Sequence, residues 1–436
     1  MKESGIDWIG QIPQEWEVIK FKYLGDVKQG LTYSPSDIVD KDEGILVLRS
    51  GNIQNGVLDF TNNVYVKTKV AESIVLRKND ILITARNGSS ALIGKNAIID
   101  TDIKATFGAF MMVFRTNKSL IAKFAFYLMN ISFNFYRTFF TTSTVNQLTA
   151  AIFNGIEVPL PSISEQQKIA DFLDKKTAQL DKVKSLLEEQ IQKLKDYRAS
   201  LIYETVTKGL DKTVPMKDSG INWIGEVPEG WGVSKLKFIL EKGSNSIKVG
   251  PFGSSLSGDA IRSSGKWVYN QRNVLDNNFT ETDFYISEAK CKELKNFSVS
   301  SGDILLTTRG TIGRVAIVPK KYCEGIIHPC LMKFKVDSKI VLPELIKYLF
   351  NDIPLVREQL NFLSNSTTID VIYSYNLKNI IIPTIPIAKQ YSILEVLDRQ
   401  TSDVDSLIKI KQKQIENINK QRQTLIYDYV TGKRRV

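Results

Sequence analysis

Residues 4–16 read SGIDWIGQIPQEW, and residues 219–231 read SGINWIGEVPEGW. The two stretches share both tryptophans, the proline and two glycines in register. Identical residues recur 215 positions later (219 − 4) for Ser4, Gly5, Ile6, Trp8, Ile9, Gly10, Pro13, Trp16, Val18, Lys20 and Lys22. Chance does not produce such agreement, so the chain contains an internal duplication.

The duplication continues through both halves of the chain. NDILITARNG (79–88) matches GDILLTTRGT (302–311), and the stretch 156–181 matches 380–405. The halves end alike, in LIYETVTKG (201–209) and LIYDYVTGK (425–433). They differ most over 25–75 against 240–298, and over 115–150 against 336–370. One scaffold therefore occurs twice with different inserts, although an ancestral dimer that fused and then drifted is an alternative.

The globular part of each half is predicted to be α+β. Short apolar runs bounded by Gly, Asn and Asp, such as DILITAR and AFMMVF, indicate strands. The stretches 119–140 and 343–363 have the apolar spacing of helices that pack on those strands, and Pro354 interrupts the second.

Each half ends in a predicted long helix with a heptad seam. The stretches 164–208 and 388–432 contain no Gly or Pro before their last few residues, so each predicts a helix of about 44 residues, about 66 Å long. The apolar seam residues are Leu173, Leu180, Leu187, Ile191, Leu194 and Leu201 in the first helix, and Leu397, Val404, Ile408, Ile415, Ile418 and Leu425 in the second.

The economical partner for each seam is the other helix of the same chain. A linker of about ten residues reaches about 35 Å at most, and a domain of about 165 residues has a radius of gyration near 15 Å. A parallel pair would need the second domain to span about 66 Å. The sequence therefore predicts an antiparallel intramolecular coiled coil that joins two similar domains at its opposite ends, with pseudo-twofold symmetry.

The predicted organisation has five parts. They are a first globular domain (1–163), a first long helix (164–208), a linker (209–218), a second globular domain (219–387) and a second long helix (388–432).

Composition favours a polyanionic partner. The net charge is +11, which suits nucleic acid first and an anionic membrane second. No apolar run reaches the roughly 18 residues that span a bilayer, and the start of the chain lacks the apolar stretch of a signal peptide. Three cysteines fit a reducing compartment. We therefore expect a cytoplasmic protein that does not bind membranes.

Catalytic motifs are scarce. The chain has one histidine, His328, so paired-histidine zinc sites are excluded, and CEGIIHPC (323–330) lacks a CxxC spacing. GSSALIGKN (88–96) has one residue too many between its glycines for a phosphate-binding loop. The E-x-K triplet in ISEAK (286–290) has no evident partner acid. We expect no catalytic residues, no metal site and no enzyme activity in this chain alone.

The repeated opening, GDILLTTRGTIGR, VPLPSISEQQKIADFLD and the LIYETVTKGL tail resemble the specificity subunit of type I restriction-modification systems. The resemblance covers nearly the whole chain, twice over. It implies two domains that each read half of a split double-stranded DNA target. It also implies that the long helices set the spacing and hold two DNA methyltransferase subunits, which bring S-adenosylmethionine, and that a restriction and translocase subunit can join. The second tail departs modestly, with IPIAKQYSI in place of ISEQQKI.

A recognition module needs basic side chains for phosphates and planar amide or guanidinium groups for base edges. The predicted DNA-binding residues are Arg49, Asn52, Arg86, Asn87 and Lys95 in the first half, and Lys248, Gln271, Arg272, Asn273, Arg309 and Arg314 in the second. A solvated or fold-stabilising role is the alternative for each of them. Arg86 and Arg309 are shared by both halves, which favours phosphate contact or structural work. Trp8, Trp16, Trp223 and Trp231 are expected to pack the scaffold.

A second hypothesis is a non-catalytic assembly scaffold whose affinity for DNA is non-specific. Equal binding to every duplex, with one salt dependence, would favour that hypothesis.

Overall fold

The structure is a computed structural model that describes residues 1–136, 146–222, 224–243, 246–363 and 371–436. The chain forms two compact units. Unit 1 comprises residues 1–188 and 412–436, and unit 2 comprises residues 189–411. Each unit therefore takes residues from both halves of the sequence, because the two long helices are divided between them.

Unit 1 is built on a four-stranded antiparallel sheet. Its strands, in spatial order, are β11 (Asn96–Ile98), β10 (Ile81–Thr84), β13 (Met111–Thr116) and β4 (Gly25–Gln29). A second sheet has the order β12 (Ala105–Phe107), β6 (Ile45–Leu48), β9 (Val64–Val66) and β5 (Ile38–Val39), with β12 and β6 parallel. Its three small two-stranded sheets are β1 (Lys2–Glu3) with β2 (Gln11–Ile12), β3 (Glu17–Lys20) with β14 (Glu157–Leu160), and β7 (Ile53–Gln54) with β8 (Val57–Leu58).

Unit 2 has a similar topology with fewer strands. Its main sheet has the order β22 (Val315–Ile317), β21 (Ile304–Thr307), β24 (Leu331–Phe334) and β18 (Ile247–Val249). The second sheet has the order β20 (Tyr285–Ile286), β19 (Lys266–Tyr269) and β23 (Gly325–Ile327), with β19 and β23 parallel. The pairs β17 (Gly232–Lys235) with β25 (Ile381–Thr384), and β15 (Met216–Asp218) with β16 (Glu226–Pro228), complete the strands of the described part.

Short helices cover the sheets. Unit 1 has α1 (Ala122–Tyr136) and α2 (Ala150–Gly155); unit 2 has α4 (Gln271–Leu275), α5 (Glu288–Glu293), α6 (Pro343–Asn351), α7 (Pro354–Leu363) and α8 (Ser374–Asn379). The predicted interruption at Pro354 is confirmed, because α6 ends at Asn351 and α7 begins at the proline. Of the first predicted helix, residues 137–140 lie outside the described residues.

The two long helices are α3 (Ile163–Lys208) and α9 (Ile387–Val430). Within unit 1, Phe172 stacks near Tyr429 with ring centroids 4.5 Å apart, and Asp181 lies 3.6 Å from Arg422. Residues with higher numbers in α3 therefore contact residues with lower numbers in α9.

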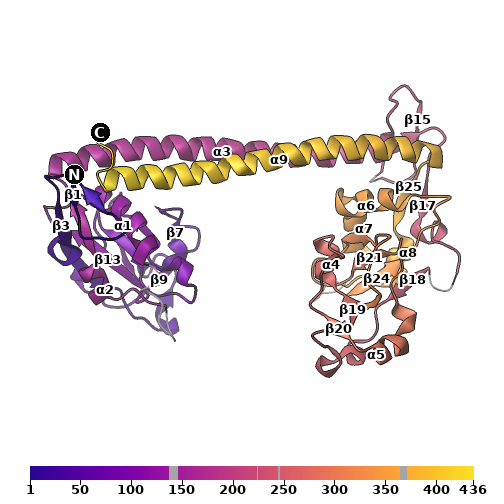
Figure 1. Cartoon of the computed structure of the whole chain (residues 1–436), viewed down its shortest axis with the longest axis horizontal. Coiled ribbons are helices and arrows are strands. Elements are labelled where there is room, and N and C mark those ends of the chain that lie inside the picture. The colour runs from indigo at the N-terminus through magenta and orange to yellow at the C-terminus, as the bar shows by residue number, and fades with distance from the viewer. Residues whose placement is uncertain (137–145, 223, 244–245, 364–370) are drawn as a thin grey trace. The chain divides into compact units, whose positions relative to one another are not determined.

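Unit 2 shows the same direction. Lys411 Nζ donates to Gln190 Oε1 at 2.6 Å, and Arg198 lies 3.1 Å from Asp405. The segments of α3 and α9 are therefore antiparallel within each unit, and Figure 1 shows them alongside one another. This confirms the predicted α+β class with a duplicated domain and an antiparallel helix pair.

The repeated opening packs against the end of a long helix. In unit 1, Trp16 and Pro13 lie against Gly432, just beyond the end of α9, and Tyr427 Oη donates to the Trp8 carbonyl at 3.1 Å. In unit 2 the Trp231 ring lies against Gly209, just beyond the end of α3. Both glycines have positive φ, +71° and +75°, which ends a helix without strain.

The opening of each sequence half therefore packs against the end of the long helix that belongs to the other half. Figure 1 shows the two chain ends near one another in unit 1. Trp8 and Trp16 are buried in unit 1 and Trp231 is buried in unit 2, while Trp223 lies outside the described residues.

A fragment of residues 1–215 should dimerise, because it lacks the α9 end but carries the equivalent end of α3. Leu201, Ile202 and Tyr203 of one copy match Leu425, Ile426 and Tyr427, so they can cover the opening of another copy. Sedimentation of the fragment measures this, with Ile202→Asp as the control that should reduce dimerisation. A monomer at high concentration would contradict the expectation.

A tyrosine ties each globular part to its long helix. Tyr127 Oη donates to Asp174 Oδ1 at 2.7 Å and lies 3.2 Å from Thr177 Oγ1. Tyr348 repeats the contact with Asp398 at 2.6 Å and Thr401 at 3.2 Å. Burial, and then the hydrogen bond to Asp398, raises the pKa of Tyr348 to about 12. Burial, and to a smaller extent the hydrogen bond to Asp174, raises the pKa of Tyr127.

Alkaline pH should therefore destabilise the protein. Each phenol has a higher pKa in the folded chain than its ordinary value of about 10, so its contribution is complete below about pH 10. That contribution is lost as the pH rises toward 12, the folded pKa of Tyr348. Urea unfolding of Tyr348→Phe should show a shallower loss of unfolding free energy above pH 10 than the parent chain does. An equal slope in both would contradict this origin.

In each unit a buried carboxylate just before β10 or β21 forms an ion pair with a cation on the neighbouring strand, β13 or β24. In unit 1, Arg115 donates to both carboxylate oxygens of Asp80, each at 2.7 Å. In unit 2, Lys333 Nζ donates to Asp303 Oδ2 at 2.9 Å, and Lys335 Nζ lies 3.8 Å from Oδ1. The carboxylates are 1% and 3% exposed.

Lys333→Met should destabilise unit 2 by about 3 kcal/mol, since it leaves a buried carboxylate without its close partner. Lys335→Met is the matched control, and it should cost about 1 kcal/mol or less because Lys335 is farther away and more exposed. Urea unfolding of the full-length variants measures both losses. Equal losses would show that Lys333 has no special role.

Candidate DNA interface

Corresponding loops occur at equivalent places in the two units. In unit 1 the loop 49–52 follows β6, and in unit 2 the loop 270–273 follows β19. A second loop in each unit follows β10 or β21 and carries Arg86 or Arg309. A third turn joins β12 to β13 or β23 to β24. Most of the predicted DNA-binding residues lie on the first two of these loops.

A buried asparagine holds the first loop in each unit. Asn52 Oδ1 accepts the Arg49 N–H at 2.9 Å, and its Nδ2 donates to the Asp59 carbonyl at 2.9 Å. The side chain is 1% exposed. Both ends of its amide are thus engaged inside the protein, which assigns Asn52 the role of fixing the loop that carries Arg49.

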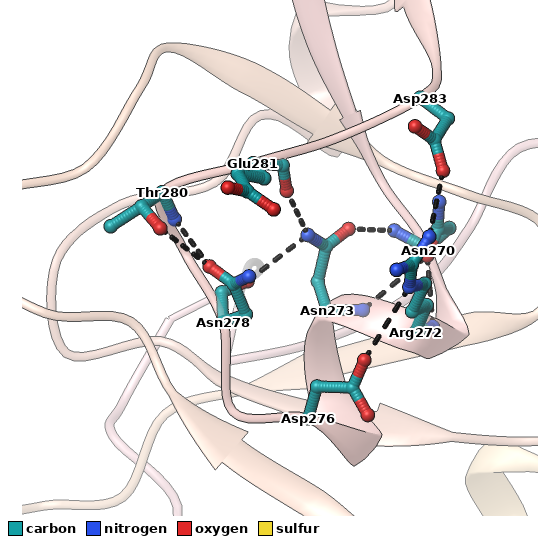
Figure 2. A network of polar contacts seen from close by, with 8 residues as sticks. All are labelled: Asn270, Arg272, Asn273, Asp276, Asn278, Thr280, Glu281 and Asp283. Atoms are coloured by element: carbon teal, nitrogen blue, oxygen red, sulfur yellow. Dashed lines mark hydrogen bonds and ion pairs between the residues drawn. The ribbon is translucent and has the colours of Figure 1, made fainter. Parts of the chain in front are cut away.

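Asn273 repeats this arrangement in unit 2 (Figure 2). Its Oδ1 accepts the Asn270 N–H at 2.9 Å, and its Nδ2 donates to the carbonyls of Asn278 and Glu281 at 3.0 and 2.8 Å. It is 3% exposed. Each asparagine therefore holds the residues just before it, which include Arg49 in unit 1 and Gln271 and Arg272 in unit 2.

Three of the predicted residues of unit 1 line one hollow. Arg49, Arg86 and Asn87 lie around a cavity of about 810 Å³. Its other lining residues come from four stretches of sequence and are mostly apolar: Leu31, Thr32, Tyr33, Pro35, Ile38, Ser50, Gly51, Gly108, Ala109, Phe110, Met111 and Gln147. The mixture of guanidinium, amide and apolar groups suits base edges and thymine methyl groups.

Phe110 and Arg86 form one element of that hollow. The Arg86 guanidinium lies 5.3 Å from the centroid of the exposed Phe110 ring. The Phe110 carbonyl also accepts the N–H groups of Ala85 and Arg86 at 2.9 and 3.0 Å. Sequence reasoning missed Phe110, because it lies in an apolar run that was interpreted as a strand.

Lys95 bonds the backbone of Ser50, a residue that lines the hollow. Its Nζ donates to the Ser50 carbonyl at 3.3 Å, and burial lowers its pKa. Lys95 does not line the hollow, whereas Ser50 does. This contact favours the structural alternative for Lys95.

In unit 2 the residues Gln271, Arg272 and Arg309 gather near one another. The Gln271 amide lies beside Gly310, the residue after the exposed Arg309. Arg272 is exposed, but its guanidinium donates to Asp283 Oδ2 at 3.0 Å and lies 3.5 Å from Asp276 (Figure 2). Both carboxylates are therefore exposed ion-pair partners of Arg272.

The remaining two predicted residues lie elsewhere. Arg314 is half-buried, and its Nη1 donates to the Asn351 carbonyl at the end of α6. Lys248 lies on β18 with its Nζ 5.5 Å from the Phe297 ring centroid. The contact of Arg314 matches a fold-stabilising role.

The predicted seam positions alternate with exposed residues along both long helices. Buried positions are Leu173, Ile191, Leu397 and Val404; half-buried positions are Leu180, Leu187, Leu194, Leu201, Ile408, Ile415, Ile418 and Leu425.

The described residues contain no helix long and apolar enough to cross a membrane. Within the same ranges, no group of three or more His, Cys, Asp or Glu side chains is placed to hold a metal ion. The three cysteines, Cys291, Cys323 and Cys330, are free thiols.

Comparison with known proteins adds a family match. The model of the type I restriction modification DNA specificity domain matches residues 13–195 and again 228–420. The type I restriction enzyme EcoKI specificity subunit of Escherichia coli strain K12 is 24% identical over 428 residues, covering 96% of this chain and 89% of the relative. The putative type I restriction enzyme MjaX specificity subunit of Methanocaldococcus jannaschii is 27% identical over 444 residues, covering 98% of this chain and 96% of the relative.

A solved structure shows the same fold. It comes from work on complex assembly and conformational transition of the type I R-M system. The match has a TM-score of 0.68 at 16% identity and covers 96% of this chain and 98% of that one.

Proposed function

The chain belongs to the family that carries the type I restriction modification DNA specificity domain, and we propose that its two units each read one half of a bipartite double-stranded DNA target. The family recognises specific DNA sequences, and this chain does so with two copies of the domain. The finer assignments below concern how the target is divided, which side chains touch it and which subunits join.

The observation that supports a bipartite target is that the two units share a scaffold but display different side chains on it. Asn52 and Asn273 make the same buried contacts, yet the three residues before them are Arg49-Ser50-Gly51 in one unit and Asn270-Gln271-Arg272 in the other. Similar scaffolds with unlike displayed side chains support two unlike half-sites.

The partners follow from the relatives, which are specificity subunits of type I restriction enzymes. We infer that this chain has no catalytic residues and directs two DNA methyltransferase subunits, which bind S-adenosylmethionine themselves. Restriction and translocase subunits join the same complex. We infer that such a complex acts in the cytoplasm, together with the cellular DNA.

Mapping methylated bases in host DNA tests this proposal. Cells that express the chain with its methyltransferase subunits should carry methylation at one split sequence with two unequal halves and a fixed number of unread bases. The matched control lacks only the gene for this chain and should lose that methylation. A continuous or palindromic motif would contradict two unlike readers.

An assembly scaffold with non-specific DNA affinity is not favoured, because the family is one of DNA specificity domains. It would bind all duplexes equally, with one dependence on salt concentration.

A further inference from the structure

The turn between β23 and β24 carries the one histidine of the chain, His328, and the corresponding turn of unit 1 carries Gly108. The backbones of the two turns match. The His328 N–H donates to the Tyr269 carbonyl at 2.8 Å, and the Gly108 N–H donates to the Leu48 carbonyl at 3.0 Å. The two units therefore differ here in the side chain they display on a shared backbone.

A close approach of backbones fixes both turns. Gly30 and Gly250 are corresponding glycines, and a Cβ on either would collide with the carbonyl oxygen of Gly108 or His328, respectively. In unit 1 this turn borders the hollow that Arg49 and Arg86 line. The side chain of His328 thus occupies a position of the recognition surface that is empty in unit 1.

The imidazole is held in one tautomer. Its Nδ1 accepts the Cys330 N–H at 3.1 Å, so the proton of the neutral ring is on Nε2. Burial, and then the positive charge of Arg309, lowers the pKa of His328, which keeps the ring neutral. The Phe284 ring, 6.1 Å away between centroids, packs edge-on against it.

The Nε2–H group is available for a ligand. Within the described part of the chain Nε2 has no hydrogen-bond partner, and it is not fully buried. Nε2 therefore presents an oriented donor to solvent, close to the charge of Arg309 and beside Phe284.

We propose that His328 is a specificity-determining residue of unit 2, whose Nε2–H donates to an acceptor on a base edge in the second half of the DNA target. Major-groove acceptors are O6 and N7 of guanine, N7 of adenine and O4 of thymine, whereas cytosine offers an amino donor that cannot pair with it. The inference rests on the proposed contact between this face of unit 2 and DNA.

Two substitutions separate base reading from support of the turn. His328→Asn retains an acceptor near the position of Nδ1 for the Cys330 N–H, but it removes the outward donor. His328→Gln places an amide donor near the position of Nε2, but it loses the acceptor for Cys330. The full-length variants are assayed on a duplex DNA library that carries randomised positions, at several salt concentrations.

We expect His328→Asn to relax base preference at one position of the second half-site by about five- to tenfold, the effect of one hydrogen bond. His328→Gln should largely retain that preference. Neither variant should change the salt dependence of binding, since a neutral donor neutralises no phosphate.

Full base preference in His328→Asn, together with reduced thermal stability in His328→Gln, would overturn the proposal and leave His328 as a support of its turn. Arg309→Ala distinguishes this failure from that of the proposed DNA-binding face. If Arg309→Ala weakens binding while His328→Asn does not alter preference, only the histidine inference fails. If neither variant changes binding, the face itself is wrong.

Discussion

One heptad added to each long helix should lengthen the recognised DNA sequence by about three unread base pairs. A heptad of helix rises about 10.5 Å, and a base pair of duplex rises about 3.4 Å. Helices α3 and α9 both run through the two units, so a matched insertion lengthens the shared segment without altering either recognition surface.

The insertion points follow from the helix contacts. Gln190 is bonded to Lys411, so the positions after Glu188 and after Lys411 lie at the same level of the pair. Repeating residues 182–188 and 405–411 at these points preserves the heptad pattern. Methylation mapping in host DNA reads the spacing. An insertion in one helix alone is the control, and it should abolish methylation because the seams no longer match.

The half-site bases themselves should stay unchanged in the doubly lengthened chain. An unaltered number of unread bases would show that the helices do not set the spacing. Changed half-site bases would show that the insertion had disturbed the recognition surfaces instead.

Arg86→Ala and Arg309→Ala should each weaken DNA binding about tenfold on every sequence tested. Both side chains are exposed, both follow the strand at the centre of the main sheet, and both units share them. A shared cation suits a phosphate, which is the same in every half-site. Each substitution should therefore also reduce the salt slope of binding by about one.

Anisotropy of labelled duplexes over a series of salt concentrations measures both quantities. Arg399→Ala, an exposed arginine on α9, is the charge-matched control and should have a much smaller effect. A loss confined to one DNA sequence, with an unchanged salt slope, would instead assign the arginines to base edges.

The scaffold was predictable because its signals are periodic. The recurrence of the SGIDWIG opening marked the duplication, and leucines at heptad spacing marked α3 and α9. The short linker after Gly209 then favoured antiparallel helices, since chain length limits how far the second domain can begin from the first helix.

The roles of single polar residues were harder to predict. Asn52 and Asn273 have the residue type of a base reader, but their partners are carbonyls five to eight residues further on, at Asp59, Asn278 and Glu281. Arg314 likewise bonds the end of α6, whose position depends on the whole fold. No local pattern reveals such contacts.

The hollow of unit 1 could not be predicted from the sequence either, because its lining depends on contacts between distant residues. Tyr33, Phe110 and Gln147 come from separate stretches, and only the folded sheet brings them together. The role of His328 as a fixed donor has no signal in the sequence, because its tautomer depends on the Cys330 N–H.

The packing of the first opening against the end of α9 has a consequence for synthesis. Unit 1 needs residues 412–436, which leave the ribosome 224 residues (412 − 188) after its main segment ends at Glu188. At roughly 5–20 residues per second, the nascent chain waits roughly ten to forty seconds with Trp16 and its apolar neighbours uncovered. During that interval the opening is exposed to chaperones, and on a polysome it is within reach of the matching helix end of a neighbouring chain.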